Sequence, residues 1–300
     1  MQTTKRMKSL FEAKPIKSFS QVYKDIEDLI AKKTMKARNS CRESGKPLLG
    51  EPLIPKDVRT STFRLPVMDQ KYDAFLEEEL KWAPPGWTSP STTKLRALKN
   101  NGRGNCLFHS VSLALWGVND YNQILRRLAN LVLEHQNDLL KKTYAKGQRK
   151  MAARGFSRHA GDEEVNEDWD AIRQSAKRSG IDADYFFLYI LSNILRRPIV
   201  MHGSVKGKTG LRGIYLPSLI DPGRCYKTPI VVGLMGDGPT NHVASLVGYD
   251  GVLSHVSLVD GSGKPLPVWY GVDDEREGSP CPETVLLQKY MELTWAEGSD

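Results

Sequence analysis

The spacing of hydrophobic positions changes about two thirds of the way along the chain. Up to about residue 195 they recur every three or four residues, as on one face of an amphipathic helix, and after Pro198 they form short continuous runs. The first pattern predicts helices over residues 19–30, 71–81, 106–116, 121–140, 168–177 and 184–195.

The later runs are rich in β-branched and large apolar residues, and glycine and proline separate them. They predict strands of one buried sheet over residues 199–201, 213–216, 229–233 and 243–247. Helices followed by strands indicate an α+β fold. Residues 45–55 and 141–165 are expected to form a loop and an exposed connection, because they are rich in glycine, proline or charge.

Composition places the chain among ordinary soluble proteins. It has 300 residues, of which 40% are hydrophobic and 26% charged, so it can bury a core without disulfides. Its four cysteines (41, 106, 225 and 281) form no CxxC pair, which argues against a structural zinc site. We see neither a signal peptide nor a membrane span. The sequence therefore predicts a reducing compartment, the cytoplasm or the nucleus.

The formal net charge of +8 raises the question of a nucleic-acid partner. Much of the excess positive charge lies in the first 40 residues and is not interleaved with aromatic side chains. Surfaces that stack nucleic-acid bases combine positive charge with aromatic side chains. A solvated basic face is therefore the expected interpretation, and contact with nucleic acid or an anionic membrane is the alternative.

The segment Gly102-Arg103-Gly104-Asn105-Cys106 suggests chemistry. It places Cys106 at the first residue of a predicted helix, directly after a glycine turn. The positive end of the helix dipole favours a thiolate, and the free N–H groups there can stabilise an oxyanion. A nucleophile fits this position, although a cysteine is often only a small buried hydrophobe.

A cysteine nucleophile needs a histidine base and a polar group that orients it. Among six histidines, His242 stands directly before the apolar run 243–247 and after a flexible loop, at the expected mouth of a core strand. His109 lies one turn beyond Cys106 and is expected to contribute to packing. The residues alone make His242 a candidate base, with an ordinary loop histidine as the alternative.

Several blocks, in order, resemble the ovarian tumour (OTU) family of deubiquitinases, and most resemble the branch that includes Cezanne and TRABID. Residues 102–107 are similar to its nucleophile motif, Gly-Asp-Gly-Asn-Cys-Leu. Residues 193–199, 213–217 and 225–231 match its Asn-Ile-Leu-Arg-Arg-Pro-Ile, Gly-Ile-Tyr-Leu-Pro and Cys-Tyr-x-x-Pro-Ile-Val segments. The resemblance covers roughly residues 60–250.

The resemblance implies a papain-like OTU fold, with helices packed around a small central β-sheet. It implies an OTU-like catalytic domain over residues 61–260. Residues 1–60 would then be a helical N-terminal extension and linker, and residues 261–300 a C-terminal tail packed on the domain.

Roles carried over by position make Cys106 the nucleophile and His242 the general base. Asp69 would orient His242, because it falls a few positions before a helix ending in Leu-x-Trp, and Asp73 is the alternative. The chain departs from the family at Arg103, where the motif has aspartate, and after His242, where a valine replaces the usual aromatic residue.

The implied reaction is thiol-dependent hydrolysis of isopeptide bonds at the ubiquitin C-terminus, without metal or organic cofactor. The implied partners are ubiquitin or polyubiquitin chains and ubiquitinated proteins. An acidic run over residues 162–168 could receive arginines of the ubiquitin tail, or be a solvated loop. Because of Arg103, the alternative is a ubiquitin-binding pseudoenzyme with weak or no hydrolytic activity.

Overall fold

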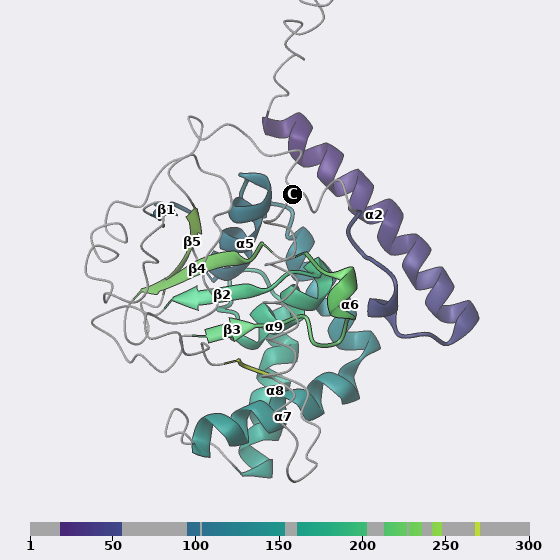
Figure 1. Ribbon diagram of the computed structural model, residues 1–300, viewed down its shortest axis with the longest axis vertical. Coiled ribbons are helices and arrows are strands. Elements are labelled where there is room, and N and C mark those ends of the chain that lie inside the picture. Colours follow the sequence, from purple (N-terminus) through teal and green to yellow (C-terminus); the bar gives the residue numbers. More distant parts are fainter. Residues whose placement is uncertain are drawn as a thin grey trace, which may run out of the picture.

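The computed structural model describes residues 19–55, 95–102, 104–153, 161–202, 213–226, 228–235, 242–247 and 268–270. Its helices are α2 (Phe19–Ser44), α5 (Cys106–Trp116), α6 (Ile124–His135), α7 (Asn137–Ala153), α8 (Asp162–Lys177) and α9 (Phe186–Leu195), with short 3-10 helices η1 (Leu48–Gly50) and η4 (Pro222–Arg224) (Figure 1). The predicted helix 71–81 lies outside the described residues.

One five-stranded sheet forms the centre of the molecule. Its strands are β1 (Arg96–Leu98), β2 (Ile199–His202), β3 (Gly213–Tyr215), β4 (Ile230–Met235) and β5 (His242–Val247), in the spatial order β1-β5-β4-β2-β3. The β2–β4 pair is parallel and the other pairs are antiparallel. The predicted α+β fold is confirmed.

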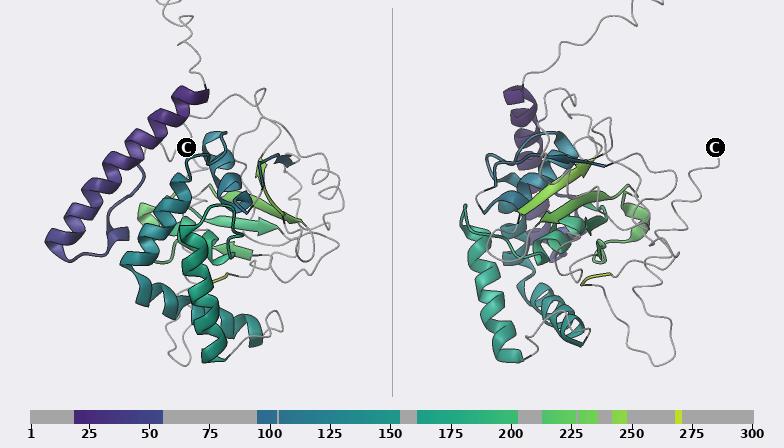
Figure 2. Two further views of the ribbon diagram at one scale, coloured as in Figure 1. Left: turned by 180° about the vertical axis from the view of Figure 1, so that it is seen from behind. Right: turned by 90° about the vertical axis from the view of Figure 1, so that its left-hand side faces the viewer.

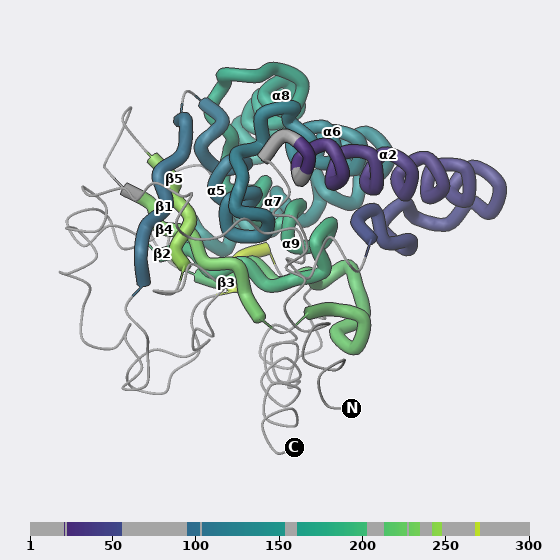
Figure 3. Tube along the Cα trace, turned by 90° about the horizontal axis from the view of Figure 1, so that it is seen from above, coloured from purple at the N-terminus to yellow at the C-terminus, as the bar shows by residue number. Residues whose placement is uncertain are grey.

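Helices gather on one side of this sheet in two layers (Figures 2 and 3). The inner layer contains α5, which packs on β4 and β5, and α9, which packs on β2 and β3. Every residue of α9 is buried, because the helix lies between the sheet and the outer helices. This inner layer fixes where the start of α5 meets the sheet.

Residues 121–153 depart from the prediction. They form two helices, α6 and α7, rather than one helix and an exposed connection. The inner face of α7 carries Leu140, Tyr144 and Met151, which are buried, between charged residues that face outward. The high charge of this segment hides a helical spacing that is sufficient to anchor it.

Two further short segments differ from expectation. The expected loop 45–55 contains η1 and buries four apolar side chains in the core: Leu48, Leu49, Leu53 and Ile54. Strand β1, which was not predicted, pairs Arg96 with Val247 and Leu98 with Ser245. A strand this short acquires its conformation from the pairing rather than from its own pattern.

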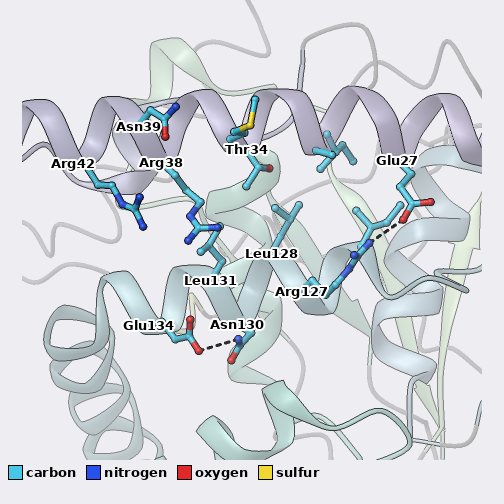
Figure 4. Close-up of a pocket in the computed structure, with 14 residues that line it drawn as sticks. Glu27, Thr34, Arg38, Asn39, Arg42, Arg127, Leu128, Asn130, Leu131 and Glu134 are labelled. Carbon is cyan, nitrogen blue, oxygen red and sulfur yellow. Dashed lines mark hydrogen bonds and ion pairs between the residues drawn. The ribbon is translucent and has the colours of Figure 1, made fainter.

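The N-terminal helix α2 lies outermost and crosses α6. Glu27 of α2 forms an ion pair with Arg127 of α6, with 3.0 Å between the charged atoms. Tyr23 and Ile26 of α2 are buried. Beyond this contact a hollow of about 600 Å³ separates the two helices; Leu128 and Leu131 are among its lining residues (Figure 4). Among the described residues, no helix is both long and apolar enough to cross a membrane.

The described C-terminal piece, residues 268–270, packs against the core. The Trp269 N–H donates to the carbonyl of Ile214 at 2.9 Å. The Tyr270 ring stacks on Tyr144 at 6.1 Å and meets the edge of Phe186 at 4.7 Å. This aromatic cluster joins α7, α9 and the C-terminal segment.

Candidate functional site

Cys106 is the first residue of α5 and is half-buried. Gly102 and Gly104 have positive φ values of 57° and 74°, and the Asn105 N–H donates to the Gly102 carbonyl at 3.2 Å. This tight turn needs glycine, because other residues rarely adopt such angles. It brings the chain into the helix with the Cys106 thiol at the helix start, as predicted.

The start of β5 lies directly against this thiol. Val243 lines the same pocket as Cys106, and its backbone N–H lowers the pKa of the Cys106 thiol. The carbonyl oxygen of Val243 accepts a 2.6 Å hydrogen bond from the Asn100 side-chain amide. The Ser110 hydroxyl lies 2.7 Å from the same oxygen. Asn100 and Ser110 thus hold β5 against α5. Neither residue is recognisable in the sequence as part of the site.

His242 is the first residue of β5 and the immediate neighbour of Val243. The structure therefore places the candidate nucleophile and the candidate base on two adjacent elements. Asp69, Asp73 and Arg103 lie outside the described residues, so the orienting role of Asp69 stays a prediction.

Three backbone N–H groups lower the pKa of the Cys106 thiol: its own and those of Leu107 and Val243. Burial is the largest effect, however, and it raises the pKa above the ordinary value, with a further rise from the Asp182 carboxylate. The thiolate expected from the helix start is therefore disfavoured at rest, and a base is needed to generate it.

A pocket of about 530 Å³ opens beside Cys106. Asp168, Asp182 and Asp184 line it, and no lysine or arginine is found among its described lining residues. Burial raises the pKa of Asp184 to about 6, although the N–H of Phe186 donates to its carboxylate at 2.7 Å. The pocket therefore presents negative charge next to Cys106.

The acidic run 162–168 contributes only in part to this pocket. Asp168 lines it, and the Asp168 carboxylate accepts a 3.4 Å hydrogen bond from the Tyr144 hydroxyl. Asp162 instead pairs with Arg149 at 2.5 Å on the exposed surface. The first turn of α8, residues 162–164, is solvated, where its acids favour the helix start.

His109 has the packing role that was expected. Its Nδ1 accepts a 2.9 Å hydrogen bond from the backbone N–H of Asp120. Burial lowers the pKa of His109 to about 4, so the imidazole is neutral at pH 7. The Asp120 carboxylate accepts from the N–H groups of Ile124 and Leu125 and so caps α6. Burial raises the pKa of Asp120 to about 7. Within the described ranges no three His, Cys, Asp or Glu residues are placed to hold a metal ion.

Comparison with known families matches residues 101–237 to the OTU-like cysteine proteases. The match contains the turn, Cys106 and the pocket residues of α8 and of segment 181–185, and it ends before His242. Residues 101–237 belong to the OTU family. The OTU domain of this chain has the fold that the sequence blocks predicted.

Relatives of this OTU domain extend the similarity. The chain is 31% identical to ubiquitin thioesterase trabid of Drosophila melanogaster over 188 residues, 56% of this chain and 24% of that protein. It is 30% identical to tumor necrosis factor alpha-induced protein 3 of Mus musculus and of Homo sapiens over 258 residues, 75% of this chain. The chain spans less than a third of either relative's length: 31% of the mouse and 30% of the human protein.

Among solved structures, the viral OTU domain protease from Farallon virus aligns with 51% of this chain and 84% of its own, at 12% identity and a TM-score of 0.34.

Proposed function

We propose that this chain is a cysteine-type deubiquitinase that hydrolyses isopeptide bonds at the ubiquitin C-terminus. The observation that supports the proposal is the packing of the start of β5 on the start of α5, where the Ser110 hydroxyl lies 2.7 Å from the carbonyls of both Cys106 and Val243, in a chain whose residues 101–237 match the OTU-like cysteine proteases. The name of the Drosophila relative, a ubiquitin thioesterase, supports the same substrate class.

In the proposed mechanism, Cys106 is a protonated thiol at rest and His242 removes its proton. The thiolate attacks the carbonyl carbon of the terminal glycine of ubiquitin, and N–H groups of the turn and helix start stabilise the oxyanion. His242 then protonates the leaving lysine amine. Water activated by His242 hydrolyses the thioester, with Asp69 orienting the imidazole throughout.

The acidic pocket supports a cationic substrate segment. Asp168, Asp182 and Asp184 converge beside Cys106 without a basic residue among the described lining residues. Their negative charge favours arginine or lysine side chains over acidic ones. The arginines of the ubiquitin tail suit this charge. Ubiquitin or polyubiquitin chains, and the proteins that carry them, are therefore the proposed partners.

A reducing compartment, the cytoplasm or the nucleus, is the proposed location. Cys41, Cys106 and Cys225 are free thiols in the structure. Free thiols persist where glutathione and thioredoxin keep them reduced, and the proposed chemistry requires Cys106 in that form.

The second candidate function is a ubiquitin-binding pseudoenzyme, which Arg103 in the nucleophile turn suggests. A ubiquitin probe with a C-terminal electrophile distinguishes the two. We expect the wild-type protein to be modified covalently at Cys106. Reversible binding of the probe without a covalent adduct would favour the pseudoenzyme.

The decisive experiment incubates linkage-defined diubiquitins with wild type and with Cys106→Ala, His242→Ala and Asp69→Ala variants. We expect cleavage by wild type, none by the first two variants, and a loss of about 100-fold or more in the third. Cys41→Ala, on the outer helix α2, is the matched control and should cleave normally. Full activity of Cys106→Ala would disprove the mechanism.

A further inference from the structure

We propose that Arg126 of α6 is a positioning residue that fastens the nucleophile turn to the segment 175–181 and so aims the start of α5. The inference deepens the proposed function and rests on it for the turnover measurement only. Arg126 does not line the pocket and is argued to act through the turn.

Arg126 is buried, with 2% of its surface exposed, and its guanidinium binds four backbone carbonyl oxygens. Nη2 donates to Gly104 in the turn at 2.8 Å and to Ile181 at 2.9 Å. Nη1 donates to Arg178 at 2.7 Å and to Ser175. Each of the four Nη–H groups thus has its own acceptor, and the acceptors belong to two segments far apart in the sequence.

The turn and this segment also meet directly. A Cβ atom added to Gly104 would lie 2.3 Å from the carbonyl carbon and oxygen of Gly180, so the two backbones are in contact. From the other side, the Asn105 side chain bonds the Ser179 hydroxyl at 3.3 Å and the Gly180 N–H at 3.4 Å. The turn is therefore held by Arg126 on one side and Asn105 on the other.

The geometry requires arginine rather than any cation. A guanidinium is a planar fork with donors on two separate nitrogens, whereas a lysine has three donors on one atom. Lysine at position 126 would leave at least one buried carbonyl without a donor. The guanidinium carbon also lies 4.6 Å from the centre of the Phe108 ring, and this contact from α5 fixes the plane of the fork.

This clamp has a consequence for the reaction. The turn ends at Cys106, so its attachment sets the direction of the sulfur and of the neighbouring N–H groups. Segment 175–181 leads into residues 181–185, which form one wall of the pocket. Arg126 therefore holds the nucleophile and one wall of the pocket in register. Displacements of about 1 Å at a catalytic group cost up to about 100-fold in rate.

The test compares the full chain with Arg126→Lys, and with Arg127→Gln as the matched control. Arg127 is the next residue, is exposed, and forms an ion pair with Glu27 on α2. Turnover is measured on ubiquitin carrying a C-terminal fluorophore, and hydrogen exchange on peptides covering residues 102–110. For Arg126→Lys we expect kcat to fall about 10- to 100-fold with KM within about threefold, and faster exchange in the turn. Arg127→Gln should match wild type in both measurements.

A wild-type kcat and unchanged exchange in a folded Arg126→Lys protein would overturn the proposal. If that variant does not fold, Asn105→Ala tests the same attachment from the other side, and unchanged exchange of its turn would also overturn the proposal. If the wild-type chain does not turn over the ubiquitin substrate, the deubiquitinase proposal fails. The exchange measurement then still decides whether Arg126 holds the turn.

Discussion

The backbone N–H of Val243 lies beside Cys106 and lowers the pKa of its thiol, at the point where the first turn of α5 meets the first residues of β5. It stabilises the charged form of the sulfur, but less strongly than burial opposes that form. The thiol is consequently a weak nucleophile until its proton is removed. Because nearby charges shift the pKa of the Cys106 thiol, substituting one of them should change the reactivity of the thiol measurably.

Asp182→Asn should make Cys106 more reactive near neutral pH. The Asp182 carboxylate raises the pKa of the thiol, so removing its charge lowers that pKa and increases the thiolate fraction. The measurement is the rate of iodoacetamide alkylation at Cys106 against pH, resolved by peptide mass spectrometry. Asp170→Asn, on the exposed side of α8, should leave the profile unchanged. A higher apparent pKa in Asp182→Asn would contradict the assignment.

Gly104→Ala should be far more damaging than Gly102→Ala. Both glycines have positive φ, so both substitutions strain the backbone by about 1 kcal/mol. At Gly104 the new methyl group would also collide with the backbone of Gly180, whereas no atom of the described residues lies within 4 Å of a Cβ added at Gly102. We expect Gly104→Ala to lose most of its turnover and Gly102→Ala to retain much of it. Equal loss in the two proteins would show that the collision is relieved at little cost.

Asp120→Asn should change how stability depends on pH. The pKa of Asp120 is about 7 in the fold and near 3.8 when unfolded, so between these values the folded protein binds a proton that the unfolded chain does not. The contribution of Asp120 to the free energy of unfolding therefore falls as pH rises from about 4 to 7. Asparagine has no such titration. Relative to wild type, the variant should gain on the order of 1 to 4 kcal/mol in unfolding free energy from pH 5 to pH 8.

Urea unfolding of both proteins at several pH values measures this difference. Asp184, whose pKa is about 6, titrates in wild type and variant alike, so its contribution cancels in the comparison. A constant difference between the two proteins across pH 5 to 8 would show that Asp120 stays charged when buried.

Tyr270→Ala should destabilise the whole domain. The Tyr270 ring is buried and touches Tyr144, Phe186 and Tyr189, so its removal leaves a large cavity in the aromatic cluster. We expect a loss of about 3–5 kcal/mol in unfolding free energy. Leu139→Ala, on an exposed position of α7, should change it by no more than about 0.5 kcal/mol. A small effect of Tyr270→Ala would show that residues 268–270 are not part of the cooperative unit.

The sequence predicted the central helices and strands because their signals are local. Helix α9 and strands β2, β4 and β5 are continuous apolar runs, and α5 begins where a glycine turn ends. Strand β1 has only three residues and is extended because β5 pairs with it. The inner face of α7 is spaced correctly but interrupted by lysines, so its helical pattern is weak when read from the sequence alone.

The candidate site was predictable in part. Cys106 and His242 stand out because each marks the start of an apolar element. Arg126 does not stand out, because an arginine on an amphipathic helix normally lies at the surface. The carbonyl groups that it binds belong to residues distant from it in the sequence. The elevated pKa of Cys106 likewise follows from burial, which depends on how α5 packs on the sheet.

The sheet order bears on which pieces of this chain can be studied separately. Strands β1 and β5 are neighbours, yet they lie on opposite sides of the family-matched residues 101–237 in the sequence. A fragment trimmed to that match would keep Cys106 and discard the two strands beside it, along with His242 and the Val243 amide. Inactivity of such a fragment would say nothing about the full chain, so truncations meant to test the proposed catalysis need to begin before Arg96 and end after Val247.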